Sequence, residues 1–305
     1  QEKELIMLSA ESEAEAIKMK MDYDKNPSEE SGSIVYIHQE SSLLEDEDEK
    51  LGDKALVSSS QILAKELKKQ NLDGLLMFRQ ESMYWLTGYD TFGYVYFQCL
   101  ILTANGNLIL LTRAPDLRQA QNTSIIKDIR IWVDKNEANP AEELKNILDE
   151  LNLGNKTLGV EYEAYGLTGR NSIKLNNSLN RSYKLKDKSE LISYLRLIKS
   201  EEEIVYIKKA AELADRALEA VWKIAKPGQS ESKILADMQS VIFEGGGDYP
   251  ANEFIIGSGH NALLCRYQSE KRILDNIDQL TIEWAGTYKH YHSAMFRTIP
   301  IGKAD

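Results

Sequence analysis

The hydrophobic residues of this chain alternate between helical and strand spacing from about residue 58 onward. Apolar residues recur at helical spacing after Ser60, which would cap the helix, and Asp73-Gly74 would end it. An Asn-Gly pair between two apolar runs predicts a β-hairpin. The predicted strands cover 75–78, 96–103, 108–112, 129–133 and 157–161, and two further helices cover 140–151 and 167–179. This alternation is typical of a compact α/β domain that ends near Lys188.

A second unit follows, and its polar caps are the clearest signals. Ser200 and Glu203 have the spacing of a capping box, so a helix is predicted from 201 to about 223. Ser230 would cap the next helix, and the three glycines at 245–247 would end it. These glycines lack the lysine and the hydroxyl residue of a phosphate-binding loop, so they indicate a helix terminator. A strand is then predicted at 252–257.

The stretch 279–302 predicts two β runs with a turn at Gly286. Before the turn, Leu280, Ile282 and Trp284 fall on one side and Glu283 on the other. After it, His290, His292 and Ala294 would share a face. Such a hairpin would gather a carboxylate, two imidazoles and Arg297 on one wall.

Charge is distributed unevenly along the 305 residues. Residues 1–53 contain 16 acidic residues and 5 lysines, which account for the whole net charge of -11 and leave the remainder neutral. Acidic runs with few apolar residues are typical of a disordered arm. A neutral remainder without a basic block argues against nucleic acid as a partner.

Targeting and redox signals are few. No apolar run approaches the roughly 20 residues that cross a bilayer, and the N-terminus lacks the pattern of a secretory signal. We therefore expect a cytoplasmic protein with no membrane partner. Cys99 and Cys265 lie far apart in the sequence, and reduced thiols are expected for both.

Four motifs in one order carry a resemblance to a known family. They are Met83–Asp90, Leu197–Ile204, Gly257–Ala262 and the hairpin with its Arg297-Thr298 ending. Together they resemble the creatinase/prolidase, or pita-bread, family of hydrolases. The tyrosine-rich stretch 88–98 and the His290-Tyr-His292 strand are most similar to the ectoine-hydrolase branch.

The resemblance implies the fold class and the domain order. After the acidic arm at 1–53, it implies a creatinase-type N-terminal α/β domain at 54–190. Residues 191–305 would then form the first part of an α+β pita-bread domain, which is incomplete. The implied partners are a small-molecule substrate and a second copy of the chain in a homodimer. In the related family the N-terminal domain of one subunit leans over the partner's active site, which would give Tyr94 and its neighbours a substrate-lid role.

Metal-dependent relatives hold two divalent ions with two Asp from this hairpin and a His and two Glu further on. Here the first Asp position matches Glu283 and the second matches Ala294, which cannot ligate a metal. The histidine placed before the hairpin matches Arg266, with His260 nearby. The chain also stops before the segment with the remaining ligands. The resemblance therefore predicts no bound cofactor, and Ala294 disfavours a divalent metal.

A metal-free hydrolase is still compatible with these residues. His290 or His292 would act as general base on water, and Glu283 would orient that water. Arg266 or Arg297 would hold a substrate carboxylate, with His260 and Tyr94 as further substrate contacts. Two alternatives stay open: a His-x-His pair on a strand can bind a metal, and Arg297 could instead pair with Glu283 across the hairpin.

Three functions follow from this reading. The first is hydrolysis of a C–N bond in a small amino-acid-like compound, as in ectoine hydrolysis. The second is a shortened, inert relative that serves as a dimerisation or binding module. The third is a metal-dependent Xaa-Pro aminopeptidase or prolidase, which Ala294 disfavours.

Overall fold

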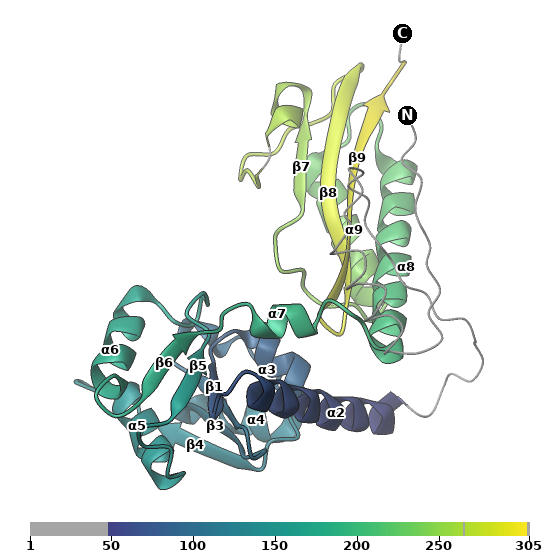
Figure 1. The fold of residues 1–305 in the computed structure, drawn as a ribbon. Helices are drawn as coiled ribbons and strands as arrows, with labels where there is room; N and C mark the ends of the chain where they lie inside the picture. Colours follow the sequence, from purple (N-terminus) through teal and green to yellow (C-terminus); the bar gives the residue numbers. More distant parts are fainter. Residues whose placement is uncertain (1–47, 265, 304–305) are drawn as a thin grey trace, which may run out of the picture. The chain divides into compact units, whose positions relative to one another are not determined.

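The computed structural model describes residues 48–264 and 266–303 (Figure 1). Residues 1–47, which make up most of the predicted acidic arm, and Cys265 lie outside the described residues. Helix α2 (Asp48–Lys69) begins at Asp48, so its first six residues belong to the stretch that was predicted to be part of the arm. The predicted cap at Ser60 is therefore wrong, because Ser60 lies inside α2 and its hydroxyl donates to the carbonyl oxygen of Leu86 at 3.2 Å.

The first domain is built on a mixed six-stranded sheet with the order β4-β3-β2-β1-β5-β6. The predicted hairpin is confirmed, since β2 and β3 pair antiparallel through the turn at 104–107. Strands β5 and β4 pair parallel to β1 and β3, respectively. The strands are β1 (Gly74–Met77), β2 (Cys99–Thr103), β3 (Leu108–Arg113), β4 (Asp128–Trp132), β5 (Thr157–Val160) and β6 (Lys184–Asp187).

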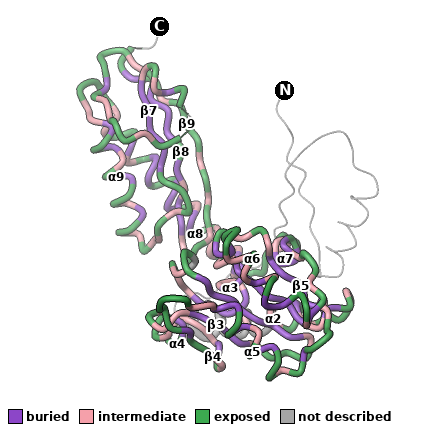
Figure 2. Tube along the Cα trace, turned by 90° about the vertical axis from the view of Figure 1, so that its left-hand side faces the viewer, coloured by how far each residue is buried: buried purple, intermediate pink, exposed green. Residues whose placement is uncertain are grey.

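Each central strand serves two hydrophobic cores, one on each face of the sheet. Leu76 packs in one core with α5 (Pro140–Glu150) and α6 (Gly169–Leu179). Leu75 and Met77 pack in the other with α2, α3 (Gln80–Thr87) and α4 (Leu117–Thr123). Buried strands run through the middle of this domain in Figure 2. Burial on both faces explains why these strands are continuous apolar runs in the sequence.

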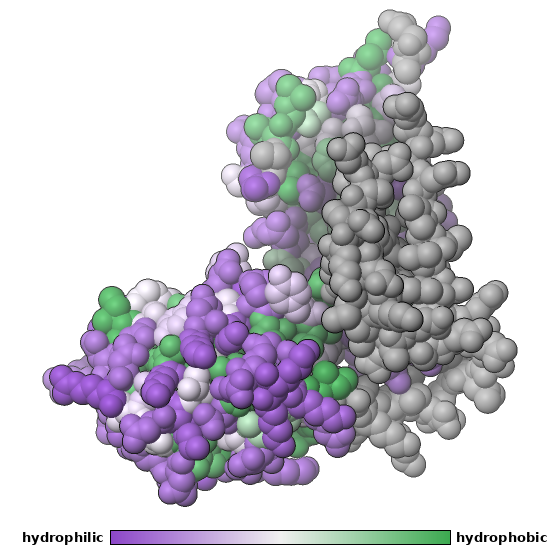
Figure 3. Space-filling model, viewed as in Figure 1, coloured by the Kyte–Doolittle hydropathy of each residue, from purple (hydrophilic) through white to green (hydrophobic). Residues whose placement is uncertain are grey.

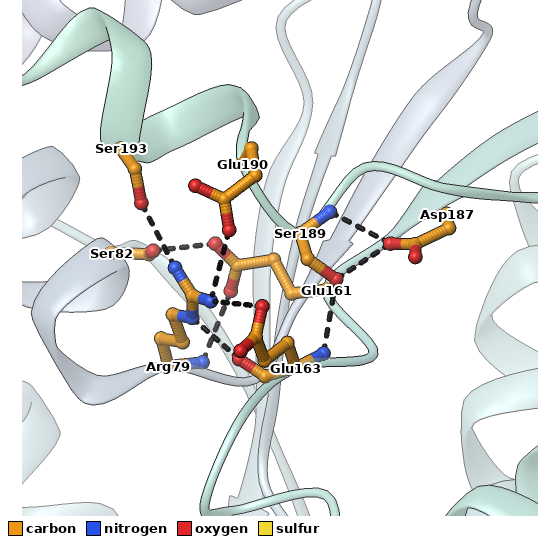
Figure 4. Close-up of polar contacts among 8 residues, drawn as sticks. All are labelled: Arg79, Ser82, Glu161, Glu163, Asp187, Ser189, Glu190 and Ser193. Atoms are coloured by element: carbon orange, nitrogen blue, oxygen red, sulfur yellow. Dashed lines mark hydrogen bonds and ion pairs between the residues drawn. The ribbon is translucent and has the colours of Figure 1, made fainter.

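A buried carboxylate connects the ends of two central strands (Figure 4). Glu161 follows β5, is 0 % exposed, and accepts the backbone N–H groups of Phe78 and Arg79 and the hydroxyl of Ser82. These donors lie at the start of α3, so Glu161 satisfies N–H groups that a helix N-terminus leaves unpaired. Burial raises the pKa of Glu161, and the hydrogen bonds counteract part of that rise.

Arg79 fastens the segment that leads out of this domain. Its guanidinium donates to the carbonyl oxygen of Glu163 at 2.6 Å and to the hydroxyl of Ser193 at 2.9 Å, and it lies 3.6 Å from carboxylates of Glu163 and Glu190 (Figure 4). Ser193 belongs to α7 (Leu191–Leu195), the short helix after β6, and Leu191 and Ile192 of this helix pack in the core that contains Leu75. The network therefore holds the start of the connection against the first domain.

The second unit pairs two helices with a three-stranded antiparallel sheet of order β7-β8-β9. The predicted caps are confirmed: Ser200 and Glu203 form a capping box on α8 (Glu201–Ile224), and Ser230 caps α9 (Glu231–Glu244). Strands β7 (Ile255–Ser258), β8 (Asp278–Tyr288) and β9 (Tyr291–Ile301) follow, with the short helix η3 (Gly259–Leu263) after β7. Apolar residues of both helices and all three strands form a third core.

Most of the first domain's visible face is hydrophilic in Figure 3, with small hydrophobic groups between polar residues. One hydrophobic group of this domain lies around η1 (Gly93–Val95), where Phe92, Val95 and Tyr96 are exposed.

Among the helices that the structure describes, none is both long and apolar enough to cross a membrane.

Candidate functional site

The β8–β9 hairpin turns at Lys289 and His290, so the predicted turn at Gly286 is wrong. Tyr288 pairs with Tyr291, and the two residues between them have φ of 49° and 61°. Such a two-residue loop with positive φ matches the twist of the flanking strands. Gly286 was predicted as a turn residue, but it is required by the close packing of β8 against α8. A Cβ at this position would lie 1.9 Å from the carbonyl oxygen of Ala210.

The register assigns each hairpin residue to one of two faces, because directly paired residues point to the same side. Leu280, Ile282 and Trp284 face the helices, and the Trp284 indole N–H donates to the carbonyl oxygen of Ala214 at 3.0 Å. Arg297 pairs with Ile282 and therefore belongs to this side. The other face, here called the open face, carries Glu283 and its partner Phe296.

Two loops cover the ends of the open face. At one end, η3 folds over Gly257, whose Cβ would lie 2.3 Å from the carbonyl oxygen of Asn261. At the other end, the Asp248 N–H donates to the carbonyl oxygen of Thr287 at 3.0 Å. The side chain of Thr287 is buried at this end. The centre stays exposed, and it includes Glu283 and Phe296, the latter 56 % exposed.

The structure does not gather the predicted wall of catalytic groups. Glu283 and His292 share the open face but are four register positions apart, or about 13 Å along the strands. His290 lies in the turn, and Arg297 lies on the opposite face, so it does not pair with Glu283. The prediction failed because it placed the turn four residues early, which shifted the second half of the hairpin.

His292 has both ring nitrogens engaged. Its Nδ1 lies 2.8 Å from the carbonyl oxygen of His290, which can only accept, so Nδ1 carries the proton. Its Nε2 accepts the backbone N–H of Ala251 at 2.9 Å. Burial lowers the pKa of His292, and it outweighs the hydrogen bond to the His290 backbone, which acts in the opposite direction. This neutral imidazole joins the hairpin to the loop after α9 and has no nitrogen left for a general base or a metal.

His290 joins the hairpin turn to the first domain. Its Nε2 lies 3.0 Å from a carboxylate oxygen of Asp90, and the Tyr84 ring meets it edge-on with centroids 4.7 Å apart. The backbone N–H of His290 donates to Asp248 at 3.2 Å. The sequence did not single out Asp90, Tyr84 or Asp248 as site residues. Only the fold brings their three segments together.

The remaining predicted residues are dispersed. His260 lies in η3 with an exposed side chain, and Arg266 is exposed in the loop that follows. The backbone of Tyr94 lies in η1, and its side chain is outside what the structure describes. Sequence reasoning also missed Arg272, which donates to the hydroxyl of Ser258 at 2.7 Å and thereby holds the loop against β7.

The open face does not fit the two-metal set that the family resemblance implies. Ala294 is the diagonal neighbour of Glu283 on this face, at a separation of about 7–8 Å that two carboxylates could bridge through metal ions. Its methyl group cannot ligate. Among the described residues there is also no cluster of three or more His, Cys, Asp or Glu side chains arranged to hold a metal ion.

Comparison with protein families identifies both domains. Residues 60–198 match the creatinase/prolidase N-terminal domain, and residues 205–305 match metallopeptidase family M24. The chain therefore belongs to the creatinase/prolidase family, with a creatinase-type N-terminal domain followed by part of a pita-bread domain.

Individual relatives agree with this assignment. The chain is 26% identical over 254 residues to an ectoine hydrolase of Halomonas elongata and 27% identical over 241 residues to an Xaa-Pro dipeptidase of Pyrococcus horikoshii. These alignments cover 78% and 77% of this chain but only 63% and 62% of the relatives.

The fold is also that of solved relatives. A prolidase from Thermococcus sibiricus superposes with a TM-score of 0.70 at 22% identity, covering 81% of this chain and 65% of that one. An X-Pro aminopeptidase from Thermotoga maritima gives a TM-score of 0.68 at 22% identity, with coverage of 81% and 66%. The chain thus spans a little under two thirds of the length of these relatives.

Proposed function

We propose that this protein is a hydrolase that cleaves a C–N bond in a small amino-acid-like compound, such as a cyclic amidine. The observation that carries the proposal is the similarity to ectoine hydrolase, which runs through both domains in the same order. The chain spans less than two thirds of the length of that relative, so we propose its hydrolytic activity for this chain rather than infer it from the similarity alone.

Glu283 is the central residue of the proposed chemistry. It is an exposed carboxylate at the centre of the open face. It would take a proton from water, the water oxygen would attack the carbon of the C–N bond, and the proton would pass to the departing nitrogen. This route needs no metal ion, which agrees with the presence beside Glu283 of Ala294, a residue that cannot ligate a metal.

The other predicted residues keep smaller roles in this proposal. Arg266 and His260 follow β7 in the chain and would contact the substrate, and Arg266 would hold its carboxylate. Tyr94 would contribute from η1 as part of a lid. The roles first assigned to His290 and His292 as general bases are less well supported, because His292 uses both nitrogens and His290 lies in the turn.

The test is hydrolysis of ectoine, creatine and an Ala-Pro dipeptide by the purified protein, after chelation and again with added Mn²⁺. We expect ectoine turnover to survive chelation and to fall about 100-fold or more in Glu283→Gln. Glu219→Gln, which changes an exposed glutamate of α8, is the matched control and should leave turnover intact. Turnover of Ala-Pro that requires Mn²⁺ would overturn the proposal in favour of a metal-dependent Xaa-Pro peptidase.

A second candidate is a catalytically inert module that associates with a second copy. The observation that favours it is Phe296, an exposed aromatic ring directly opposite Glu283 on the open face. Phe296 also lies on β9, an edge strand of its sheet, and an uncovered edge strand favours association with another chain. No turnover of any substrate, together with a solution mass that rises with concentration, would establish this candidate instead.

A further inference from the structure

A small cavity lies where the hairpin turn meets the first domain, away from Glu283. Its volume is about 280 Å³, enough for a compact amino-acid-sized molecule. It is lined by residues from three segments, among them Tyr84, Asp90, Asp248, Tyr288, Lys289 and His290. From Glu283 to Tyr288 is five residues along β8, or about 17 Å, so the cavity is separate from the centre of the open face.

Two carboxylates in this cavity have binding capacity to spare. One Asp90 oxygen lies 3.0 Å from the His290 ring, and one Asp248 oxygen accepts the His290 backbone N–H at 3.2 Å. Among the described residues, no hydrogen bond or ion pair engages the second oxygen of either carboxylate. His290 thus holds both side chains in place and leaves an acceptor on each.

Lys289 also lines this cavity. Lys289 occupies the first turn position, and its ammonium group makes no ion pair or hydrogen bond with the described part of the chain. Its neighbour His290 is fixed by contacts to Asp90, Asp248 and Tyr84, so the turn presents Lys289 from a fixed backbone. The cavity therefore has a negative side and a positive side.

Aromatic rings complete the wall. Tyr84 and Tyr288 both line the cavity. The pKa of the Tyr84 hydroxyl is raised, first by burial and then by the charges of Asp90 and Asp248 among others, so both carboxylates lie close to this neutral hydroxyl. Aromatic rings beside carboxylates are the groups that recognise organic cations in proteins.

We propose that this cavity binds a small organic zwitterion whose guanidinium or amidinium group contacts Asp90, Asp248 and Tyr84 and whose carboxylate contacts Lys289. A delocalised planar cation can donate to two carboxylates at once, and it packs favourably against tyrosine rings. This binding site is distinct from the proposed hydrolytic site, so it does not depend on whether the protein hydrolyses ectoine.

The test uses isothermal titration of the full chain with 4-guanidinobutyrate and with 1-propylguanidine, which has a similar cationic group but no carboxylate. We expect 4-guanidinobutyrate to bind about tenfold more tightly than 1-propylguanidine, because 1-propylguanidine has no carboxylate to contact Lys289. Lys289→Gln should remove this preference and leave the binding of 1-propylguanidine unchanged.

The carboxylate side is tested with Asp248→Asn, in which the amide oxygen can still accept the His290 N–H and preserve the loop. Binding of both probes should weaken about tenfold. Asp215→Asn, on the exposed face of α8, is the matched control and should have no effect. Absence of 4-guanidinobutyrate binding by the wild-type chain, or equal binding by wild type and Asp248→Asn with unchanged thermal midpoints, would overturn the proposal.

Discussion

The two sheets of this protein are covered differently, and the difference determines what each can do. The six-stranded sheet has a hydrophobic core on each face, with Leu76 in one and Leu75 in the other. The β7–β9 sheet has helices on one face only, and Glu283 lies on the face without helices. The first sheet is thus a scaffold, whereas the second exposes a polar surface on which a substrate could lie.

The largest effect is expected where the second sheet meets its helix. Gly286→Ala would place a methyl group 1.9 Å from the carbonyl oxygen of Ala210, and backbone atoms cannot move aside as a flexible side chain can. We expect a loss of more than about 3 kcal/mol in the free energy of unfolding, measured by urea denaturation monitored by circular dichroism. Gly154→Ala, where a Cβ meets nothing within 4 Å, is the control. Equal stability of the two variants would show that the sheet can move away from α8.

In the first domain, we expect substitution of the buried carboxylate Glu161 to lower the stability most. Glu161→Leu would leave the N–H groups of Phe78 and Arg79 and the hydroxyl of Ser82 without their buried partner. We expect a loss of about 3 kcal/mol in the free energy of unfolding. Glu161→Gln keeps an acceptor oxygen and should lose less, and Glu143→Leu changes an exposed carboxylate of α5 as control. A Glu161→Leu variant as stable as wild type would mean that water replaces the carboxylate.

The smallest expected effect is a pH dependence of stability that arises from His292 in the β8–β9 hairpin. The pKa of His292 is lowered in the folded protein, so folding favours the neutral ring. Its contribution to stability is present above the unfolded pKa of about 6.5 and is lost as the pH falls through the lower folded value. Thermal midpoints at pH 8 and pH 5.5 should therefore differ less for His292→Gln than for wild type. An identical difference in both proteins would contradict the lowered pKa of His292.

Sequence patterns predicted the first domain well because each signal there was local. Continuous apolar runs indicated strands buried on both faces, and the Asn-Gly pair indicated the β2–β3 hairpin. The capping box at Ser200 was equally direct, since all its partners lie within one turn. The start of α2 was missed because the twelve residues before Ser60 are mostly polar or charged and show little helical periodicity.

The candidate site was predicted in part, and the failures have physical causes. The exposed carboxylate Glu283 was correctly placed opposite the apolar side of its strand. The turn was misplaced because glycine can be required by close packing as well as by backbone conformation, and only the approach of Ala210 shows which applies at Gly286. The cavity around Asp90 and Asp248 could not be predicted, because its residues come from segments about 160 positions apart.

Glu203 illustrates how one side chain can tie distant parts of the chain into a single cooperative unit. One of its oxygens accepts the backbone N–H of Ser200 at the start of α8, and the other accepts the hydroxyl of Tyr291 at the start of β9, 2.8 Å away. Fraying of the helix end would release the strand, and fraying of the strand would release the helix end. Opening of either segment therefore removes a contact of the other, although the two lie 88 residues apart in the sequence.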